Sequence, residues 1–131
     1  MTAASTVLEC PINDGHKLRV EFFKNGDRYA HRLAAVLVDD AGRETVIPLA
    51  ESVECDNDDP WPPSPPLQSL SIEELAGGRT AALLVGMAGR SHWSASVEVV
   101  PGSGSTKFQL ASRFTTVPDR LGSTYRIAPE I

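Results

Sequence analysis

Carboxylates gather near the middle of the chain, where they form the best candidate for a cation site. Asp56, Asp58 and Asp59 stand in one Asp-Asn-Asp-Asp run, and Glu54 lies just before them. Calcium prefers several carboxylate and carbonyl oxygens supplied by such a loop. The run has neither the spacing nor the glycine of an EF-hand loop, so we predict a solvated acidic loop that takes part in binding, and no metal ligands. A calcium-dependent ligand-binding sandwich is the alternative.

A proline-rich run, residues 61–66 (Trp-Pro-Pro-Ser-Pro-Pro), follows the acidic residues directly. Its prolines supply no N–H donors and fix φ, so the run can be neither helix nor strand. Such a sequence can be a polyproline II ligand for an aromatic groove, but those ligands usually lie in tails. Because this run interrupts the chain, we predict a rigid crossover between two halves of a domain. Trp61 would anchor it by folding back onto a sheet.

His92 is the candidate for acid–base chemistry, since it lies between Ser91 and Ser94. A small hydrolase or isomerase would combine it with an acidic partner, yet no Gly-x-Ser-x-Gly motif supplies a nucleophile. Alternation along this stretch puts His92 and Ser94 on one outer strand face, which favours an exposed polar ladder. We therefore expect a binding role for His92, together with Arg90 from the preceding turn, and assign no catalytic residue.

The strands that position these residues are predicted from alternating apolar and polar side chains. In the first half of the chain, the Asn-Gly pair at 25–26 is the strongest short hairpin signal. As a two-residue turn it places Phe22 opposite Tyr29 and Val20 opposite His31, which makes one face apolar. His31 is then expected to be a hydrogen-bonded, partly buried residue rather than a metal ligand.

The second half contains one ambiguous segment. Residues 71–76 fit a helix with a capping box, but they also alternate as a strand does. We favour the strand, because a turn at Gly77-Gly78 would then pair Ile72 with Leu83 on an apolar face. Residues 80–87 are apolar on both faces, which indicates a central strand.

These patterns give about eight short strands separated by turns about every eight to twelve residues, as in an antiparallel sandwich or barrel. We predict a single all-β domain over residues 1–131, an antiparallel β-sandwich, with a partly open β-barrel as the alternative. Pro48 lies inside one of the strands and places it at an edge or at a bulge.

Charge excludes some partners. The 131 residues include 12 Lys and Arg against 17 Asp and Glu, for a formal net charge of −5. Nucleic-acid phosphates call for a concentrated basic face, and anionic membranes also attract basic segments. We therefore expect neither nucleic acid nor a membrane as a partner. Nothing in the sequence implies a cofactor.

The N-terminal residues contain no secretory signal, and the longest nearly apolar run, residues 81–88, is too short to span a bilayer. A cytoplasmic location is the expectation. In that compartment Cys10 and Cys55 are expected to be two thiols rather than a disulfide. Being 45 positions apart in the sequence, they form no metal-ligand motif.

Residues 59–68 (DPWPPSPPLQ) and 86–94 (GMAGRSHWS) resemble stretches of small uncharacterised bacterial proteins of planctomycete type. The resemblance implies a family without an assigned activity, so it assigns no functional residue. Together with the patterns above, it leads us to expect a binding or protein-interaction module that uses residues 56–66 and 86–93. The partner would be a protein or a small molecule, and apolar, proline-bearing sheet edges also favour a homodimer.

Overall fold

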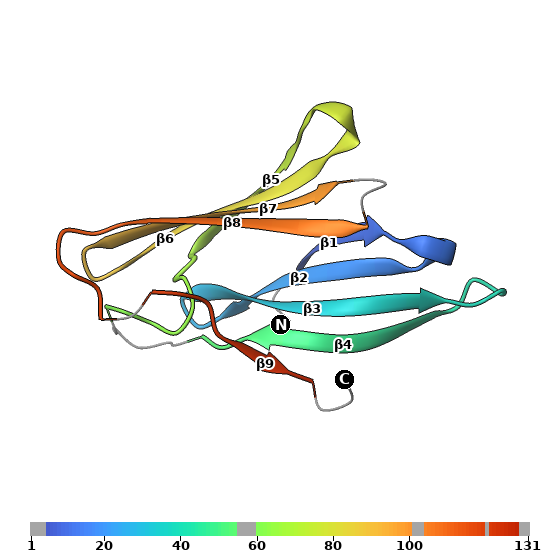
Figure 1. Ribbon diagram of the computed structural model, residues 1–131, viewed down its shortest axis with the longest axis horizontal. Helices are drawn as coiled ribbons and strands as arrows, with labels where there is room; N and C mark the ends of the chain where they lie inside the picture. Colours follow the sequence, from blue (N-terminus) through green and yellow to red (C-terminus); the bar gives the residue numbers. More distant parts are fainter. Residues whose placement is uncertain (1–4, 55–59, 101–103, 120, 129–131) are drawn as a thin grey trace.

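The computed structural model describes residues 5–54, 60–100, 104–119 and 121–128, and these residues form two antiparallel β-sheets (Figure 1). The larger sheet has five strands in the order β1-β2-β3-β4-β9. Its strands are β1 (Thr6–Pro11), β2 (Lys17–Asn25), β3 (Arg28–Val38), β4 (Glu44–Ser52) and β9 (Tyr125–Ile127). The first four are neighbours in both sequence and space, whereas β9 arrives from the C-terminal part of the chain.

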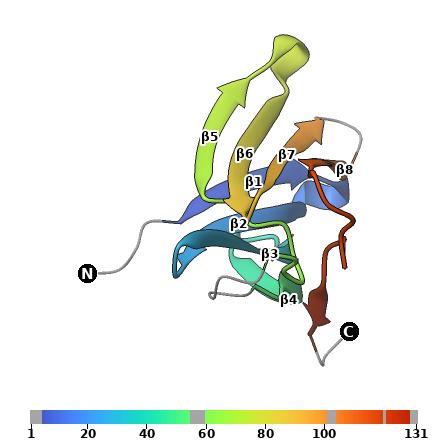
Figure 2. The ribbon, with the colours of Figure 1, turned by 90° about the vertical axis from the view of Figure 1, so that its left-hand side faces the viewer.

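The smaller sheet has four strands in chain order: β5 (Ser69–Glu74), β6 (Thr80–Ala88), β7 (Ser91–Val100) and β8 (Ser105–Arg113). Figure 2 shows this sheet standing over the five-stranded sheet, with the segment after β8 descending to β9. The two sheets do not close into a barrel, so the predicted β-sandwich is confirmed. Two short 3-10 turns interrupt the strands, at Asn13–Gly15 and Ala76–Gly78. Within the described ranges, no helix is long and apolar enough to cross a membrane.

The core lies between β1, β2 and β3 on one side and β6 and β7 on the other. Phe22 and Leu84 are its largest fully buried side chains. The predicted alternation of β7 is confirmed, since its odd-numbered residues from Trp93 to Val99 are buried in this cluster. Burying each large apolar side chain contributes about 1.5–3 kcal/mol, so the two sheets are held together chiefly by these positions.

The β2–β3 hairpin forms where the Asn-Gly pair predicts it, but its pairing register is different. Asn25 is opposite Arg28, so the two turn residues are Gly26 and Asp27. Gly26 has φ 70° at the first central position, the position that favours glycine in a type II′ turn. The predicted pairings were therefore wrong by two residues: His31 faces Phe22 instead of Val20. Because a shift of two keeps every side chain on its face, the apolar face is still the one predicted.

The β5–β6 pairing differs in a way that changes a surface. The structure confirms a strand at Ser69–Glu74 rather than a helix, and β6 is a central strand as predicted. The 3-10 turn lengthens the connection, so Ile72 lies opposite Ala82 and not Leu83. A shift of one residue exchanges the two faces of a strand. Leu83 consequently faces away from the core and is exposed.

Pro48 lies beside an irregularity in the β3–β4 ladder. Leu33 pairs with Ala50 but Ala34 pairs with Pro48, so one residue of β4 is skipped. The predicted bulge at this proline is confirmed, and it accommodates a residue that cannot donate a ladder hydrogen bond.

The described part of the proline-rich segment, residues 60–68, joins the two sheets, and we call it the seam. Five of its residues are buried: Pro62, Ser64, Pro65, Pro66 and Leu67. One backbone bond ties it to each sheet: Tyr29 N–H donates to Leu67 O at 2.6 Å, and Gln68 N–H donates to Val85 O at 2.8 Å. The predicted crossover is therefore confirmed.

Candidate functional site

The acidic residues of the predicted binding loop, Asp56, Asp58 and Asp59, lie outside the described residues, as does Cys55. The acidic loop and the state of the two cysteines therefore stay predictions. Cys10 is buried, and its thiol donates to the carbonyl oxygen of Ser105 at 3.2 Å.

Trp61 and Arg90, two of the predicted binding residues from separate stretches of the chain, lie together. They line a hollow of about 280 Å³ between the seam, the β6–β7 turn and the residues after β8. Trp61 is half-buried, and its ring packs edge-on against Phe114 with 6.0 Å between centroids. The turn approaches closely at Gly89, where an added Cβ would lie 3.2 Å from the Cβ of Pro60. Trp61 thus anchors the seam while leaving part of its surface exposed.

His92 is exposed on the outer face of β7, opposite Met87 on β6 and Arg113 on β8. The shallow hollow beside it has no carboxylate among its lining residues. Ser91 cannot serve as its nucleophile, because its buried hydroxyl donates to Ala88 O at 2.7 Å and accepts from Trp93 Nε1 at 2.8 Å. The described residues assemble no His-acid pair here, and the part of the chain that the structure describes contains no group of three His, Cys, Asp or Glu suited to a metal.

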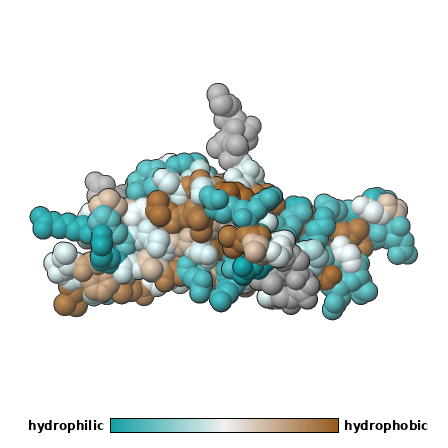
Figure 3. All heavy atoms as spheres, turned by 90° about the horizontal axis from the view of Figure 1, so that it is seen from above, coloured by the Kyte–Doolittle hydropathy of each residue, from teal (hydrophilic) through white to brown (hydrophobic). Residues whose placement is uncertain are grey.

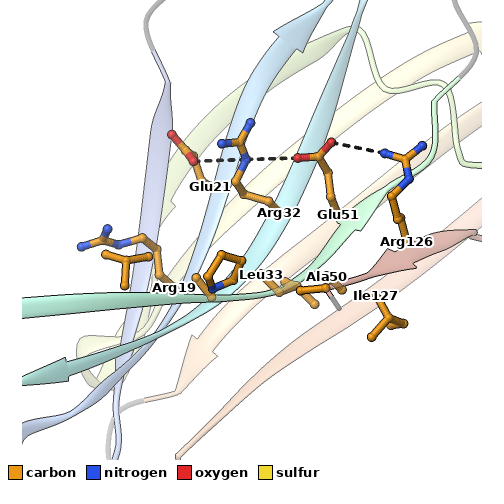
Figure 4. Close-up of a pocket in the computed structure, with 12 residues that line it drawn as sticks. Arg19, Glu21, Arg32, Leu33, Ala50, Glu51, Arg126 and Ile127 are labelled. Carbon is orange, nitrogen blue, oxygen red and sulfur yellow. Dashed lines mark ion pairs between the residues drawn. The ribbon is translucent and has the colours of Figure 1, made fainter. Parts of the chain in front are cut away.

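Another hollow lies on the outer face of the five-stranded sheet (Figure 4). It has a volume of about 400 Å³ and spans β2, β3, β4 and β9. Small side chains form its floor at Ala34 and Pro48, which pair with each other beside the long charged side chains of the same face. Val46 adds exposed apolar surface on this face, whereas Ala50 and Ile127, which also border the hollow, share the face of Leu33, which packs against the core. A depression of this kind arises because short residues cannot fill the space that their long neighbours enclose.

A row of alternating charges borders this hollow. Glu21, Arg32, Glu51 and Arg126 occupy directly opposite positions on β2, β3, β4 and β9. Arg32 Nε lies 3.5 Å from a carboxylate oxygen of Glu21 and 3.5 Å from one of Glu51, and Arg126 lies 4.0 Å from Glu51. Figure 4 shows the four side chains as one chain of ion pairs.

Two further contacts fix the border. The guanidinium of Arg32 lies 4.2 Å from the ring centroid of Phe23, a distance typical of a cation–π interaction. On the opposite side of the hollow, Arg19 is held by Glu9 at 2.7 Å. The arginines on both sides are therefore pre-positioned by neighbours, and only Arg126 is held loosely.

Sequence reasoning missed this hollow because its residues come from four strands and meet only when the ladder register is known. A usable signal was present: Arg32 can lie between two glutamates only in the observed β2–β3 and β3–β4 registers.

A buried polar cluster lies between the sheets. His31 Nε2 and the Tyr125 hydroxyl are 2.7 Å apart, and the His31 ring also packs against Phe22 and Phe108. Burial lowers the pKa of His31 to about 4, so it is neutral near pH 7. This confirms the predicted hydrogen-bonded, buried histidine.

Glu54 lines the same narrow cavity as His31 and Tyr125. Burial raises its pKa to about 7, against the opposing effects of a hydrogen bond with Ser52 and the charge of Arg28. Burial, with a smaller contribution from Glu54, also raises the pKa of Tyr125. The cavity measures about 10 Å³, room for about one water molecule, so the cluster is part of the core and not a ligand site.

No protein-family model, no curated protein and no solved structure matches this chain.

Proposed function

We propose that this protein is a binding module whose ligand enters the hollow on the outer face of the five-stranded sheet. The observation that carries the proposal is the combination of an apolar, small-residue floor with a pre-positioned row of charges beside it. Ligand sites are typically concave and mostly apolar, with a few polar groups that fix orientation. The hollow also lies within the lower part of the usual volume range of such sites, about 300–1,000 Å³.

The charges favour a ligand that carries a carboxylate or another anionic group beside an apolar portion. Three arginines and two glutamates line the hollow, and Glu9 pairs with Arg19 beside it, so the positive charge most open to a ligand is that of Arg126. Arg126 has a side chain that is 72% exposed, and its ion pair with Glu51 is long at 4.0 Å. A ligand carboxylate would therefore gain close, charge-assisted hydrogen bonds at this guanidinium without breaking a strong one. The apolar portion would lie against Val46 and Pro48.

Nuclear magnetic resonance titration with three small probes of equal chain length tests this proposal. Hexanoate, hexanamide and hexylamine share the apolar tail and differ in charge. We expect hexanoate to bind with a Kd on the order of millimolar, hexanamide more weakly, and hexylamine most weakly. Shifts should concentrate at Ala34, Glu51 and Ile127.

Arg126→Gln should weaken hexanoate binding about tenfold and leave hexanamide unchanged, since it removes only the ion pair with the probe. The matched control is Arg43→Gln. Arg43 is also exposed and paired with a carboxylate, that of Asp39, but lies at the tip of the β3–β4 hairpin. Equal binding of all three probes, or shifts confined to other faces, would refute the proposed site.

The calcium alternative keeps its own test, because its three aspartates lie outside the described residues. Calorimetric titration with calcium that gives no heat, together with an unchanged melting temperature, would reject a calcium-dependent sandwich. The hydrolase or isomerase alternative has no supporting contact at His92 among the described residues.

A further inference from the structure

The outer face of the four-stranded sheet carries an apolar row on its central strand. Leu83, Val85 and Met87 of β6 point away from the core and are 42%, 53% and 45% exposed. Seen from this side, apolar surface is visible near the middle of the molecule, next to hydrophilic surface, and again along the lower left of the view (Figure 3). We call these three residues the ridge. Antiparallel sheets with one solvated face normally alternate apolar-in and polar-out, and β6 departs from that rule.

The neighbouring strands keep the rule and place short side chains beside the ridge. Ser71 and Ser96 lie opposite Leu83, while Ser69 and Ser94 lie opposite Val85. The ridge therefore stands above two rows of serines. At its Met87 end, a shallow hollow of about 630 Å³ extends from β5 across to β8. A surface that combines a ridge with a hollow beside it can complement itself.

We propose that this face binds a second copy of the chain, with the ridge of each protomer lying in the serine-lined hollow of the other. Such an interface is isologous, because both protomers use one patch. It would cover most of the apolar surface of β6, and it follows the aligned or orthogonal packing of two sheets face to face.

Charges on this face favour a second copy. Glu98 on the outer face is paired with Arg79 at 2.8 Å. Arg113 lies at one end of the face and Glu73 at the other, and neither forms an ion pair with another described residue. A two-fold axis lying in the interface can bring Arg113 of each protomer to Glu73 of its partner.

The size of the face predicts a weak dimer. Neighbouring strands lie about 4.8 Å apart, and each residue lengthens a strand by about 3.3 Å. The outer face of this sheet therefore has an area of about 400–500 Å². Specific interfaces typically bury about 800 Å² on each partner. We therefore expect a dissociation constant on the order of 10–100 µM.

Sedimentation velocity between about 5 and 500 µM of the full chain tests the proposal, since the dimer fraction must follow mass action. Val85→Lys should raise the dissociation constant roughly 100-fold, because the substitution occurs twice in a symmetric interface. Val117→Lys is the matched control: Val117 is 88% exposed in the segment after β8, and this variant should dimerise as the wild type does. All variants change exposed side chains and should keep the wild-type melting temperature.

Charge reversal tests the two-fold arrangement. Arg113→Glu and Glu73→Arg should each weaken the dimer about tenfold, and the double variant should recover wild-type affinity. A chain that stays monomeric at the highest concentration overturns the proposal. So does a dimer that Val85→Lys leaves unchanged, which would assign the contact to another surface, such as the outer edge of β8.

Discussion

Gly86 is the residue whose replacement tests the packing of the seam most directly. It lies on the central strand β6, where the backbone of the seam passes against it. A Cβ added at Gly86 would lie 1.7 Å from the carbonyl oxygen of Pro66 and 2.7 Å from its carbonyl carbon. Both atoms belong to the backbone, so no side-chain rotation relieves the clash. We expect Gly86→Ala to destabilise the protein severely.

The size of the effect follows from what must move. The seam or β6 has to shift by at least about 1.3 Å to restore the 3.0 Å that is the shortest realistic contact. That shift breaks or stretches the bonds Tyr29 N–H to Leu67 O and Gln68 N–H to Val85 O, each contributing about 1 kcal/mol. It also loosens the buried Leu67 and the core beneath it. We estimate a total loss of about 3–5 kcal/mol, a large share of the about 5–15 kcal/mol that stabilises a typical domain.

Thermal unfolding followed by circular dichroism measures this prediction. A loss of this size should lower the Tm by about 10–25 °C in a chain of this length. Gly77→Ala is the control, because Gly77 has φ +77° but no atom within 4 Å of an added Cβ. That variant carries only backbone strain, about 1–2 kcal/mol.

The expected sign makes the comparison decisive. Away from a clash, alanine in a strand is favoured over glycine by about 0.5–1 kcal/mol, and the φ of Gly86 is not in the left-handed region. The close approach of the seam to β6 is refuted if the Tm of Gly86→Ala is within a few degrees of the wild-type Tm. It is also refuted if Gly86→Ala lowers the Tm less than Gly77→Ala does.

Two further variants address buried polar groups. Ser64→Ala should lower the free energy of unfolding by about 1–2 kcal/mol, because the buried Ser64 hydroxyl donates to Thr124 O and accepts from Thr124 N–H, both at 3.2 Å; urea unfolding with an unchanged midpoint would contradict this. Glu54→Gln should raise stability at pH 8 by about 1–2 kcal/mol and leave it unchanged at pH 4. Between 4.5 and about 7, the folded wild type binds more protons at Glu54 than the unfolded chain does, so stability falls as the pH rises; removing that group abolishes the loss. The buried His31 acts in the opposite direction, since its pKa of about 4 lies below its ordinary 6.5 and stability is lost as the pH falls through that window. In the wild type the effects of Glu54 and His31 on the pH dependence of the free energy of unfolding offset each other. With Glu54→Gln only the effect of His31 remains, so the free energy of unfolding should increase with pH between about 4 and 6.5. Urea unfolding across this pH range measures both effects, and parallel profiles for the two proteins would rule out a buried Glu54.

The strands, and the core faces of β2 and β7, were predictable because burial on one face makes apolar and polar residues alternate with a period of two. Register was harder. Moving the β2–β3 pairing by two residues leaves every apolar side chain facing the core. The hydrophobic pattern therefore could not distinguish the predicted register from the observed one. The ion pairs of Arg32 with Glu21 and Glu51 exist in the observed frame, and they are the information that the pattern lacked.

The candidate sites divide in the same way. Trp61 and Arg90 could each be picked out from consecutive residues, the proline run and the turn before His92, but that they line one hollow could not. The hollow on the five-stranded sheet was not predictable, because Arg126 reaches Glu51 only through the pairing of β4 with β9. That pairing joins strands separated by the whole four-stranded sheet in sequence, and no local pattern encodes it.

The ridge depends on the seam. In the predicted pairing Ile72 lies opposite Leu83, and Leu83 would face the core. In the observed pairing Leu83 faces solvent. Gln68 holds this register: its N–H donates to Val85 O, and its side chain accepts from Met87 N–H and donates to Met87 O. Val85 and Met87 are ridge residues, so the hydrogen bonds of Gln68 hold the strand segment that carries the proposed interface. A segment without secondary structure thereby decides which side of β6 is available to a partner, and Gly86, between these two residues, allows the seam to come close enough to do so.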